Sequence, residues 1–345
     1  MASHRRPKQP SRARTYVLTG AAATAVALSA QVSAHAAPAQ PNKNEVKAQV
    51  DKLLEEQEQA TEKYNGAKER ADQLHKQAAQ LQDQLARGQE QLNELASGLA
   101  AVAGDQYRHA GVDPSMQLML SSDPDKYLAQ ASSFDQAAST QSATLKALQE
   151  QQRRLEQQKR EAATVLAELD DQTQVLNGAR STVQSKLAEA QRLLATLSAA
   201  DRAAIVRGTD ESASRSASRV DPASLPSASG AAKVAVEAAL KKQGSDYISG
   251  ATGPNTFDCS GLMVWAYAQA GVSLPRTSQA QATAGTNVGT DWHNAQPGDL
   301  VIYKSDRSHV AMYIGNGMVV HAPKAGDVVK VMKVDAISIN VIRRV

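Results

Sequence analysis

Apolar residues recur at alternating spacings of three and four residues along two long stretches of the chain. Repeats sustained over this length are typical of coiled-coil helices. The repeat positions are Val46, Val50, Leu53, Gln57, Ala60, Tyr64, Ala67, Ala71, Leu74, Ala78, Leu81, Leu85, Gly88, Leu92, Leu95, Leu99 and Val102 in the first stretch, and Leu145, Leu148, Gln152, Leu155, Lys159, Ala162, Leu166, Leu169, Thr173, Leu176, Arg180, Val183, Leu187, Ala190, Leu194 and Leu197 in the second. Because the two stretches are similar in length, we expect an all-α antiparallel coiled coil over residues 41–205.

The segment between the two stretches, residues 104–144, forms the tip of the expected hairpin. Pro114 and Pro124 break the repeat there, so we expect short helices. The apolar residues of this tip are Met116, Leu118, Met119, Leu120, Tyr127, Leu128 and Phe134. They either cap the coiled coil or form an exposed patch that docks on a partner. Capping is favoured, because buried cap residues are commoner than binding patches.

Composition changes twice after the coiled coil. Residues 206–230 are rich in Ser, Ala and Pro, which is typical of a flexible linker. Residues 231–345 contain both tryptophans and most of the glycines, which is the composition of a globular domain.

The start of the chain has the pattern of a targeting segment. Five basic residues precede an apolar run over residues 16–30, and Ala34 and Ala36 follow in an A-x-A arrangement. This order predicts a secretory signal peptide over residues 1–36, cleaved near Ala36, and therefore a secreted protein. The formal net charge of the whole chain is +3, and loss of those five basic residues leaves −2. We therefore expect no nucleic-acid partner.

A single cysteine, Cys259, occurs in the chain. In an exported protein it is a buried apolar residue, a bridge between molecules or a reactive thiol. The pattern that follows it, DCSGLMVWAYAQAG, predicts a helix that Asp258 caps and Gly271 ends. Cys259 then lies at the first helical turn, where unpaired N–H groups stabilise a thiolate. Gly250 and Gly253 in the preceding loop would let a substrate approach the sulfur closely.

Two histidines bracket a predicted β-hairpin, SHVAMYIGNGMVVHAP. Its strands cover residues 309–314 and 318–322, and a three-residue loop, residues 315–317, connects them. In this register His309 and His321 lie on one face as a diagonal pair. A two-residue Asn-Gly loop would put His321 on the other face. A shared-face pair favours a Cys-His-His arrangement with Cys259 as nucleophile.

The register of this hairpin follows from the loop type. A type I turn followed by Gly317 in the left-handed region makes Ile314 face Met318 and Ala311 face His321. The opposite face is then apolar and consists of Val310, Met312, Ile314, Met318 and Val320.

Residues 231–345 closely resemble the NlpC-type cysteine endopeptidases of bacterial cell walls, which have a papain-like fold. The resemblance implies an α+β domain in which the helix that bears the cysteine packs on an antiparallel sheet. The matching stretches are FDCSGLMVWAYAQAGVSLPRTSQAQ, QPGDLVIY and SHVAMYIGNGMVVHAP, in the order of that family. The resemblance implies a peptidoglycan hydrolase that cleaves stem peptides at the bond between D-isoglutamate and a diamino acid. It implies that Cys259 is the nucleophile, His309 the base and His321 the residue that orients His309.

The resemblance also implies substrate contacts beside the nucleophile. Tyr247 contributes to substrate or oxyanion contacts, and Asp258 and Ser260 recognise the free end of the stem peptide. The chain departs from the family at DYISGATG, because Ser249 stands where a tryptophan is common. Arg276 also matches the family and is interpreted as structural.

The N-terminal half is similar to the coiled-coil domain of Gram-positive cell-division peptidoglycan hydrolases. This similarity implies a membrane-bound regulator that contacts the coiled-coil tip and a coiled coil that regulates or positions the peptidase. The implied location is the cell wall.

Three alternatives stay open at the level of sequence. One is a non-catalytic wall-binding adaptor, and another is an amidase or acyltransferase of the same superfamily. The third is a zinc site made by Cys259, His309 and His321, which the lack of a close C-x-x-C or H-x-x-x-H pair disfavours. We therefore expect no metal and no cofactor.

Overall fold

The computed structural model describes residues 42–109, 116, 123–206, 220, 226 and 230–345. The predicted signal peptide, residues 1–36, lies outside this part, as do most of the predicted linker and the middle of the predicted tip. Within the described part, none of the helices is both long enough and apolar enough to cross a membrane.

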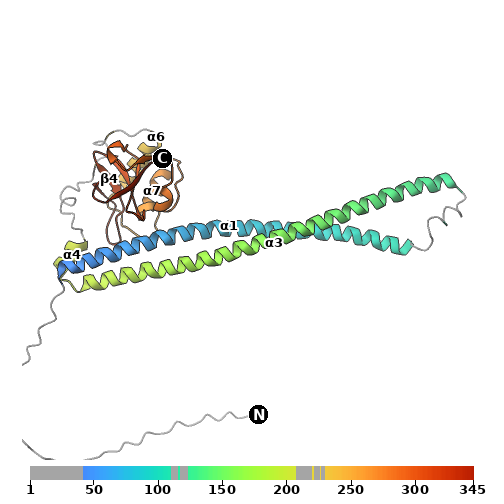
Figure 1. Cartoon of the computed structure of the whole chain (residues 1–345), viewed down its shortest axis with the longest axis horizontal. Helices are drawn as coiled ribbons and strands as arrows, with labels where there is room; N and C mark the ends of the chain where they lie inside the picture. The colour runs from blue at the N-terminus through green and yellow to red at the C-terminus, as the bar shows by residue number, and fades with distance from the viewer. Residues whose placement is uncertain (1–41, 110–115, 117–122, 207–219, 221–225, 227–229) are drawn as a thin grey trace, which may run out of the picture. The chain divides into compact units, whose positions relative to one another are not determined.

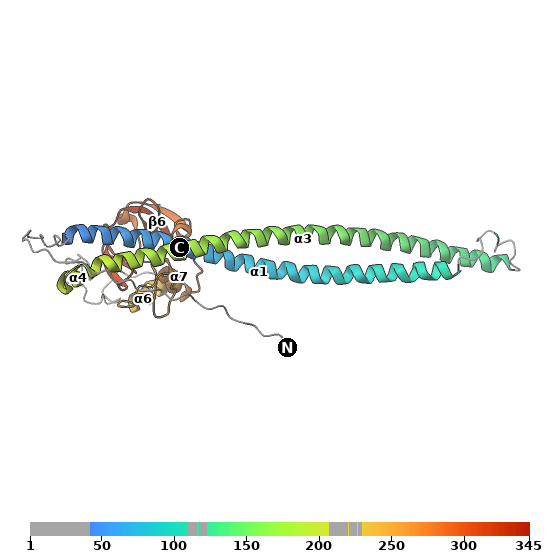
Figure 2. The ribbon, with the colours of Figure 1, turned by 90° about the horizontal axis from the view of Figure 1, so that it is seen from below.

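Two long helices form the N-terminal half: α1 (Lys43–His109) and α3 (Pro124–Ala195), with the short α4 (Ala199–Val206) after them. They run antiparallel, because Arg70 pairs with Glu168 at 2.6 Å whereas the Gln151 side chain donates to the carbonyl of Gly88 at 3.1 Å. Both views of the ribbon show α1 and α3 side by side (Figures 1 and 2). The prediction of two long, packed helices is confirmed, whereas the supercoiled geometry of a coiled coil stays a prediction.

Packing between the two helices follows the predicted repeat. Leu74, Leu81 and Val165 form one buried cluster, and Val46, Val50 and Leu53 contribute to another near the start of α1. Buried apolar side chains of this size each contribute about 1.5–3 kcal/mol to folding.

Gly88 occupies a repeat position where the helices approach closely. A Cβ there would lie 2.8 Å from the side chain of Leu155, so the gap admits no larger residue without a shift.

The tip differs from the expectation of short helices. Helix α1 continues to His109, and α3 begins at Pro124, so most of residues 104–144 belongs to the long helices. Proline is well tolerated at the first position of a helix, because its missing N–H has no helical partner there. Met116 is 61% exposed. The side chains of Leu118, Met119, Leu120, Tyr127, Leu128 and Phe134 lie outside the described residues.

The C-terminal part, residues 230–345, is built on one six-stranded antiparallel sheet. The strands are β1 (Thr286–Gly289), β2 (Leu300–Tyr303), β3 (His309–Gly315), β4 (Met318–His321), β5 (Lys330–Lys333) and β6 (Ile339–Arg344), in the order β1-β6-β2-β3-β4-β5. The helical elements are α6 (Gly230–Lys241), α7 (Cys259–Ala268), α8 (Ser278–Gln281) and the 3-10 turn η2 (Trp292–Asn294). The predicted α+β class, with the cysteine-bearing helix on an antiparallel sheet, is confirmed.

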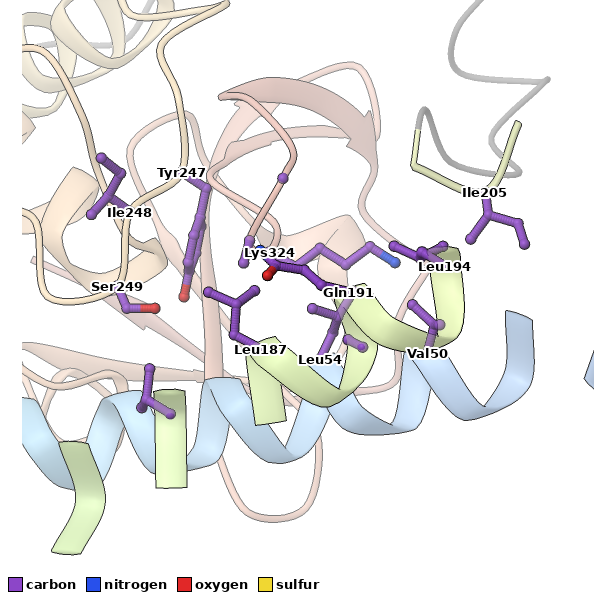
Figure 3. A pocket seen from close by; sticks show the side chains of 14 residues that line it. Val50, Leu54, Leu187, Gln191, Leu194, Ile205, Tyr247, Ile248, Ser249 and Lys324 are labelled. Carbon is purple, nitrogen blue, oxygen red and sulfur yellow. The ribbon is translucent and has the colours of Figure 1, made fainter. Parts of the chain in front are cut away.

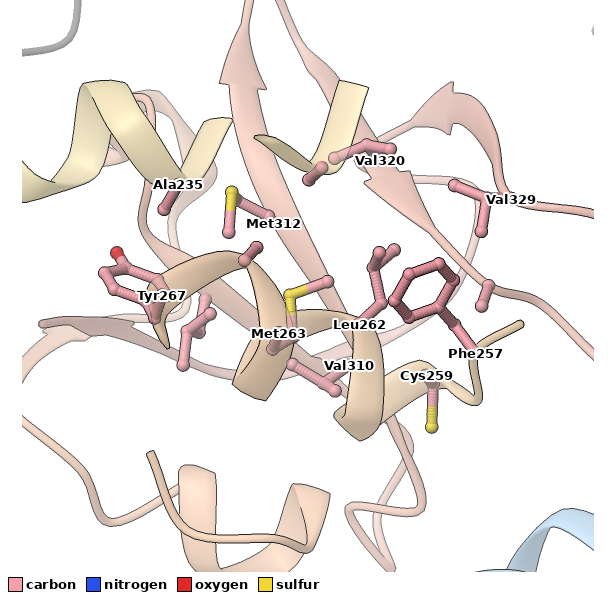
Figure 4. Close-up of a cluster of buried hydrophobic side chains, with 14 of the residues drawn as sticks. Ala235, Phe257, Cys259, Leu262, Met263, Tyr267, Val310, Met312, Val320 and Val329 are labelled. Carbon is pink, nitrogen blue, oxygen red and sulfur yellow. The ribbon is translucent and has the colours of Figure 1, made fainter. Parts of the chain in front are cut away.

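The main core lies between this sheet and helices α6 and α7. Phe257, Leu262 and Met263 from the α7 region pack there with Val310 and Met312 of β3 (Figure 4). A second cluster, which includes Val301, Ala311 and Val319, covers the other face. Residues that alternate along β3 thus belong to different clusters, as the period of two in a strand requires.

The β3–β4 hairpin keeps the predicted register by a different loop. Met312 pairs with Val320, which is the register in which Ala311 faces His321. The loop, however, has two residues, Asn316 and Gly317, both with positive φ (54° and 68°), which is a type I′ pattern. A β-bulge between Tyr313 and Gly315 adds one residue to β3, so Gly315 and not Ile314 faces Met318. The bulge keeps His321 on the same face as His309 despite the shorter loop. The expectation that a two-residue loop would misplace His321 was therefore wrong.

Candidate active site

Cys259 is the first residue of helix α7, as predicted. Asp258 caps the helix, and its Oδ1 accepts a hydrogen bond of 2.7 Å from the backbone N–H of Gly261. A Cβ on Gly261 would lie only 2.1 Å from the carbonyl oxygen of Ala251, so the DCSG turn requires glycine there. The Cys259 side chain lies at this end of the helix, at the edge of the core (Figure 4).

The structure brings the two hairpin histidines together with this cysteine. His309 Nε2 lies 2.9 Å from His321 Nδ1, and both side chains are buried. The ring of His309 also places a nitrogen within 4.8 Å of Cys259 Sγ. The ring of His309 therefore lies near the thiol and is bonded to a second imidazole, that of His321.

His321 is suited to orient His309 and poorly suited to carry charge. Its pKa is well below the usual value, because burial disfavours the charged ring and His309 and Lys330 add positive charge nearby. Among the described residues, its Nε2 has no hydrogen-bond partner. A neutral His321 can fix the ring of His309 through Nδ1.

Asp258 and Ser260, the predicted substrate contacts, are held by Arg276. Its guanidinium donates to both carboxylate oxygens of Asp258, at 3.0 and 2.6 Å, and to Ser260 Oγ at 2.9 Å. Asp258 Oδ2 also accepts from the backbone N–H of Gly250 at 2.9 Å. Arg276 thus fixes the position of these side chains, which matches its interpretation as structural.

Gly253 and Tyr247, which precede helix α7, do not lie open beside the sulfur. A Cβ at Gly253 would meet the rings of Phe257 and Trp265 at 2.5 and 2.7 Å, so this glycine allows aromatic packing and not access to the sulfur. Tyr247 is buried, and in the described part of the chain its hydroxyl finds no partner. Burial and the nearby carboxylates and thiol raise its pKa well above the usual value.

Comparisons with known proteins assign part of this chain to a family. Residues 244–340 match the model of the NlpC/P60 family. That segment is an NlpC/P60 domain. The resemblance seen in the sequence is therefore confirmed for this segment, which contains Cys259, His309 and His321.

Relatives of the NlpC/P60 domain include proteins named as probable endopeptidases. One from Corynebacterium glutamicum is 56% identical over 87 residues, 25% of this chain and 41% of that protein. One from Mycobacterium tuberculosis is 45% identical over 101 residues, 29% of this chain and 26% of that protein. The chain thus spans well under half the length of these relatives. A crystal structure titled as the NlpC/p60 domain of the peptidoglycan hydrolase SagA is 32% identical, covers 33% of this chain and 98% of that one, and has a TM-score of 0.31.

Helix α1 contributes two carboxylates to the site of the NlpC/P60 domain. Glu58 Oε1 accepts a hydrogen bond of 2.6 Å from His309 Nδ1, and its Oε2 accepts one of 2.8 Å from Lys304. Glu62 Oε1 lies 3.7 Å from Cys259 Sγ and accepts from Ser260 Oγ at 2.7 Å. With these contacts, Cys259 is only 1% exposed and His309 only 2%.

These carboxylates change the protonation of the nucleophile. Burial raises the pKa of the Cys259 thiol well above its usual value, and the charges of Glu62, Glu58 and Asp258 raise it further. Burial and the neighbouring Asp258 raise the pKa of Glu62 to about 7. Burial would also raise the pKa of Glu58, but His309 and Lys304 outweigh it and lower that pKa. In this arrangement the imidazole pairs with Glu58, and the sulfur stays a thiol.

Neutral side chains of α1 extend the contact on both sides. Asn65 Nδ2 donates to Asp258 Oδ2 at 3.0 Å, and Gln57 Nε2 donates to Ser249 Oγ at 2.6 Å. Ser249 therefore meets helix α1 at the position where the family commonly has tryptophan.

A cavity of about 460 Å³ lies beside this contact (Figure 3). Apolar residues of α1, α3 and α4 line it together with Tyr247, Ile248, Ser249 and the loop at Lys324. Cys259 and the two histidines are not among its lining residues, so it is separate from the thiol. A larger side chain at position 249 would have to enter this cavity or displace Gln57.

The sequence pattern predicts the cysteine and both histidines of the site, but not the contacts that Glu58 and Glu62 of α1 make with them. Gln57 was assigned to a repeat position, and Glu58, Glu62 and Asn65 fell at positions that ordinarily face water. The sequence does contain a signal, since Gln57, Thr61 and Asn65 recur every four residues beside Glu58 and Glu62. The structure buries all five of these side chains.

Proposed function

We propose that this protein is an exported peptidoglycan hydrolase whose NlpC/P60 domain cleaves stem peptides by cysteine chemistry. The observation that carries the proposal is the cluster of Cys259 at a helix start, His309 beside its thiol and His321 bonded to His309. The names of the relatives support the reaction class. Cleavage takes place at the cell wall, at the bond between D-isoglutamate and a diamino acid.

Each residue of the cluster has a role in this mechanism. His309 Nδ1 takes the proton of Cys259, and the thiolate attacks the carbonyl carbon of the peptide. Backbone N–H groups at the start of α7 stabilise the tetrahedral oxyanion. His309 then protonates the leaving amine, and water hydrolyses the thioester. His321 keeps the ring of His309 oriented, and Asp258, Ser260 and Tyr247 position the stem peptide.

Product analysis on purified muropeptides tests this proposal. We expect a new amine on the diamino acid and a free carboxyl on D-isoglutamate, and neither product with Cys259→Ala. Cleavage between the sugar and the first amino acid would indicate an amidase, and a transferred acyl group would indicate an acyltransferase. Wall binding without any product would favour the non-catalytic adaptor.

We further propose that helix α1 keeps the peptidase inactive until a partner releases it. The α1 carboxylates support this, because Glu58 pairs with the base and Glu62 lies next to the thiol. A linker of the length of residues 206–230 gives a tethered domain an effective concentration on the order of millimolar, so a weak contact is enough to close the site. The membrane-bound regulator implied by the resemblance would bind the tip around residues 116–134 and shift the population toward the open state.

A comparison of two proteins at matched concentration tests this regulation. Residues 231–345 alone should digest purified walls faster than the protein without residues 1–36, after correction for wall binding. Equal rates, or a faster long protein, would mean that the helices position the peptidase and do not inhibit it.

A further inference from the structure

Three different metal-binding side chains meet at the covered thiol. A carboxylate oxygen of Glu58, the sulfur of Cys259 and a ring nitrogen of His309 all lie within 4.8 Å of one another, and all three residues are buried. They come from α1, α7 and β3, which are separate parts of the chain. Thiolate, imidazole and carboxylate are the ligands that zinc uses in proteins.

The separations suit a small tetrahedral ion. Zinc binds sulfur at about 2.3 Å and nitrogen or oxygen at about 2.0–2.2 Å, so ligand atoms in such a site lie roughly 3.3–3.7 Å apart. His309 Nδ1 and Glu58 Oε1 are now 2.6 Å apart and share a proton. Shifts of about 1 Å would replace that proton by the metal. His321 is excluded as the third ligand, because its Nδ1 contacts the far nitrogen of His309.

One of the three carboxylates around the sulfur, that of Glu62, is not paired with a basic side chain in the described part of the chain. Lys304 pairs with Glu58 and Arg276 with Asp258. In the described part of the chain Glu62 makes no ion pair, although its carboxylate lies 3.7 Å from the sulfur. Burial of an unpaired carboxylate is costly, and a nearby divalent ion would offset that cost. Glu62 or a water molecule can take the fourth position.

We propose that Glu58, Cys259 and His309 form a site for a thiophilic divalent cation such as Zn²⁺ when α1 covers the peptidase. Binding displaces the thiol proton and the proton between Glu58 and His309, and the metal then joins α1 to the two residues that it covers. The site does not depend on the proposed peptidase activity. Only its consequence, a zinc-stabilised inactive state, rests on that function.

Cobalt titration of the protein without residues 1–36 tests the site without an activity assay. After treatment with a chelator, we expect one Co²⁺ per chain, a thiolate-to-cobalt charge-transfer band in the near ultraviolet and ligand-field bands typical of a tetrahedral site. Competition with Zn²⁺ then gives the zinc affinity. Cobalt binding without the charge-transfer band, or no binding, would overturn the proposal.

Variants of Glu58 separate coordination from simple contact. Glu58→Ala should weaken Zn²⁺ binding by at least about 10-fold. Glu58→His removes the carboxylate but supplies another ligand atom, so it should keep binding within about 10-fold of the unmodified protein. If Glu58→Ala binds Zn²⁺ as tightly as the unmodified protein, or Glu58→His as weakly as Glu58→Ala, Glu58 is not a ligand. Glu90→Gln, on an exposed part of α1, is the control and should bind normally.

Discussion

Helix α1 has two parts that bury different kinds of residue. In the part that faces the NlpC/P60 domain, Gln57, Glu58, Thr61, Glu62 and Asn65 are all at most 4% exposed. Farther along the same helix, Leu74 and Leu81 are buried against α3, and charged residues such as Glu90 and Glu94 are exposed. The first part therefore has a polar buried face, and the second has the apolar seam of a helix that packs only on another helix.

The polar and apolar faces of α1 are suited to different kinds of contact. An apolar seam stabilises a helical pair without precise polar partners, because its free energy comes from removal of apolar area from water. A polar face that is complementary to charged groups is reversible, because water can replace its hydrogen bonds when the helix leaves. The buried polar stretch of α1 is thus suited to a contact that opens and closes, whereas the apolar seam is suited to a permanent one.

The largest effect should come from the residue that the polar stretch covers. Cys259→Ala should lower wall hydrolysis by at least roughly 10³-fold, because no other group can form the thioester. The domain should still fold, since the change removes one small side chain at a helix start. Muropeptide release measures activity, and circular dichroism checks the fold. Retained cleavage by this variant would rule out thiol catalysis, and the polar stretch of α1 would then cover a residue that has no role in cleavage.

The two histidines should respond unequally. His309→Ala should be almost as inactive as Cys259→Ala, because the base is lost. His321 Nδ1 lies 2.9 Å from His309 Nε2, and His321→Gln keeps a hydrogen-bonding group in that side chain, so it should lose only about 10–100-fold. Rates on purified muropeptides, with thermal unfolding as a control, measure both. Equal loss in the two variants would show that the division of roles is wrong.

Removal of the two negative charges of the polar stretch should expose the thiol more often. Glu58→Gln with Glu62→Gln keeps the size of both side chains but weakens their bonds to His309 and Ser260. Hydrogen bonds to charged groups are worth about 1.5–3 kcal/mol, so the open population should rise by about 10–100-fold. Cys259 in the intact chain should be alkylated faster by about this factor, and wall hydrolysis should rise until it reaches the rate of residues 231–345.

Glu90→Gln with Glu94→Gln is the matched control. It removes the same two charges at the same spacing from an exposed face of the same helix. Its alkylation rate should equal that of the unmodified protein. A similar increase in both double variants would mean that general charge, and not the contact at the site, controls access to the thiol.

A neutral contact should matter less. Asn65→Ala removes one hydrogen bond to Asp258, whose carboxylate keeps its bonds to Arg276 and to two backbone N–H groups. We expect an increase in Cys259 alkylation of up to about 10-fold, below that of the Glu58 and Glu62 double variant. An effect larger than that of the double variant would place the main closing contact at Asp258.

Much of this molecule follows from local sequence patterns, and the contact between its halves does not. The repeat spacing gives the two long helices, and the DCSG turn and the alternation along β3 and β4 place Cys259, His309 and His321. Each of these depends on neighbours within about 15 residues. The bond between Glu58 and His309 joins residues 251 positions apart, and a glutamate on a helix is ordinarily a solvent-exposed residue. The predicted length of the hairpin loop was wrong for a related reason. The bulge beside Gly315 depends on pairing between the two strands, which the local sequence does not determine.

The smallest effect should come from Gln57, whose side-chain amide has one end hydrogen-bonded and the other end without a partner among the described residues. Its Nε2 donates to Ser249 at 2.6 Å, but among the described residues its buried Oε1 has no partner. An unsatisfied buried oxygen costs about 1–3 kcal/mol, which offsets most of what the Ser249 bond contributes. Gln57→Ala should therefore change the alkylation rate of Cys259 by less than about 3-fold, measured beside Asn65→Ala under the same conditions. A larger increase would mean that the Ser249 contact holds α1 on the peptidase, and that serine at the usual tryptophan position serves the closed state.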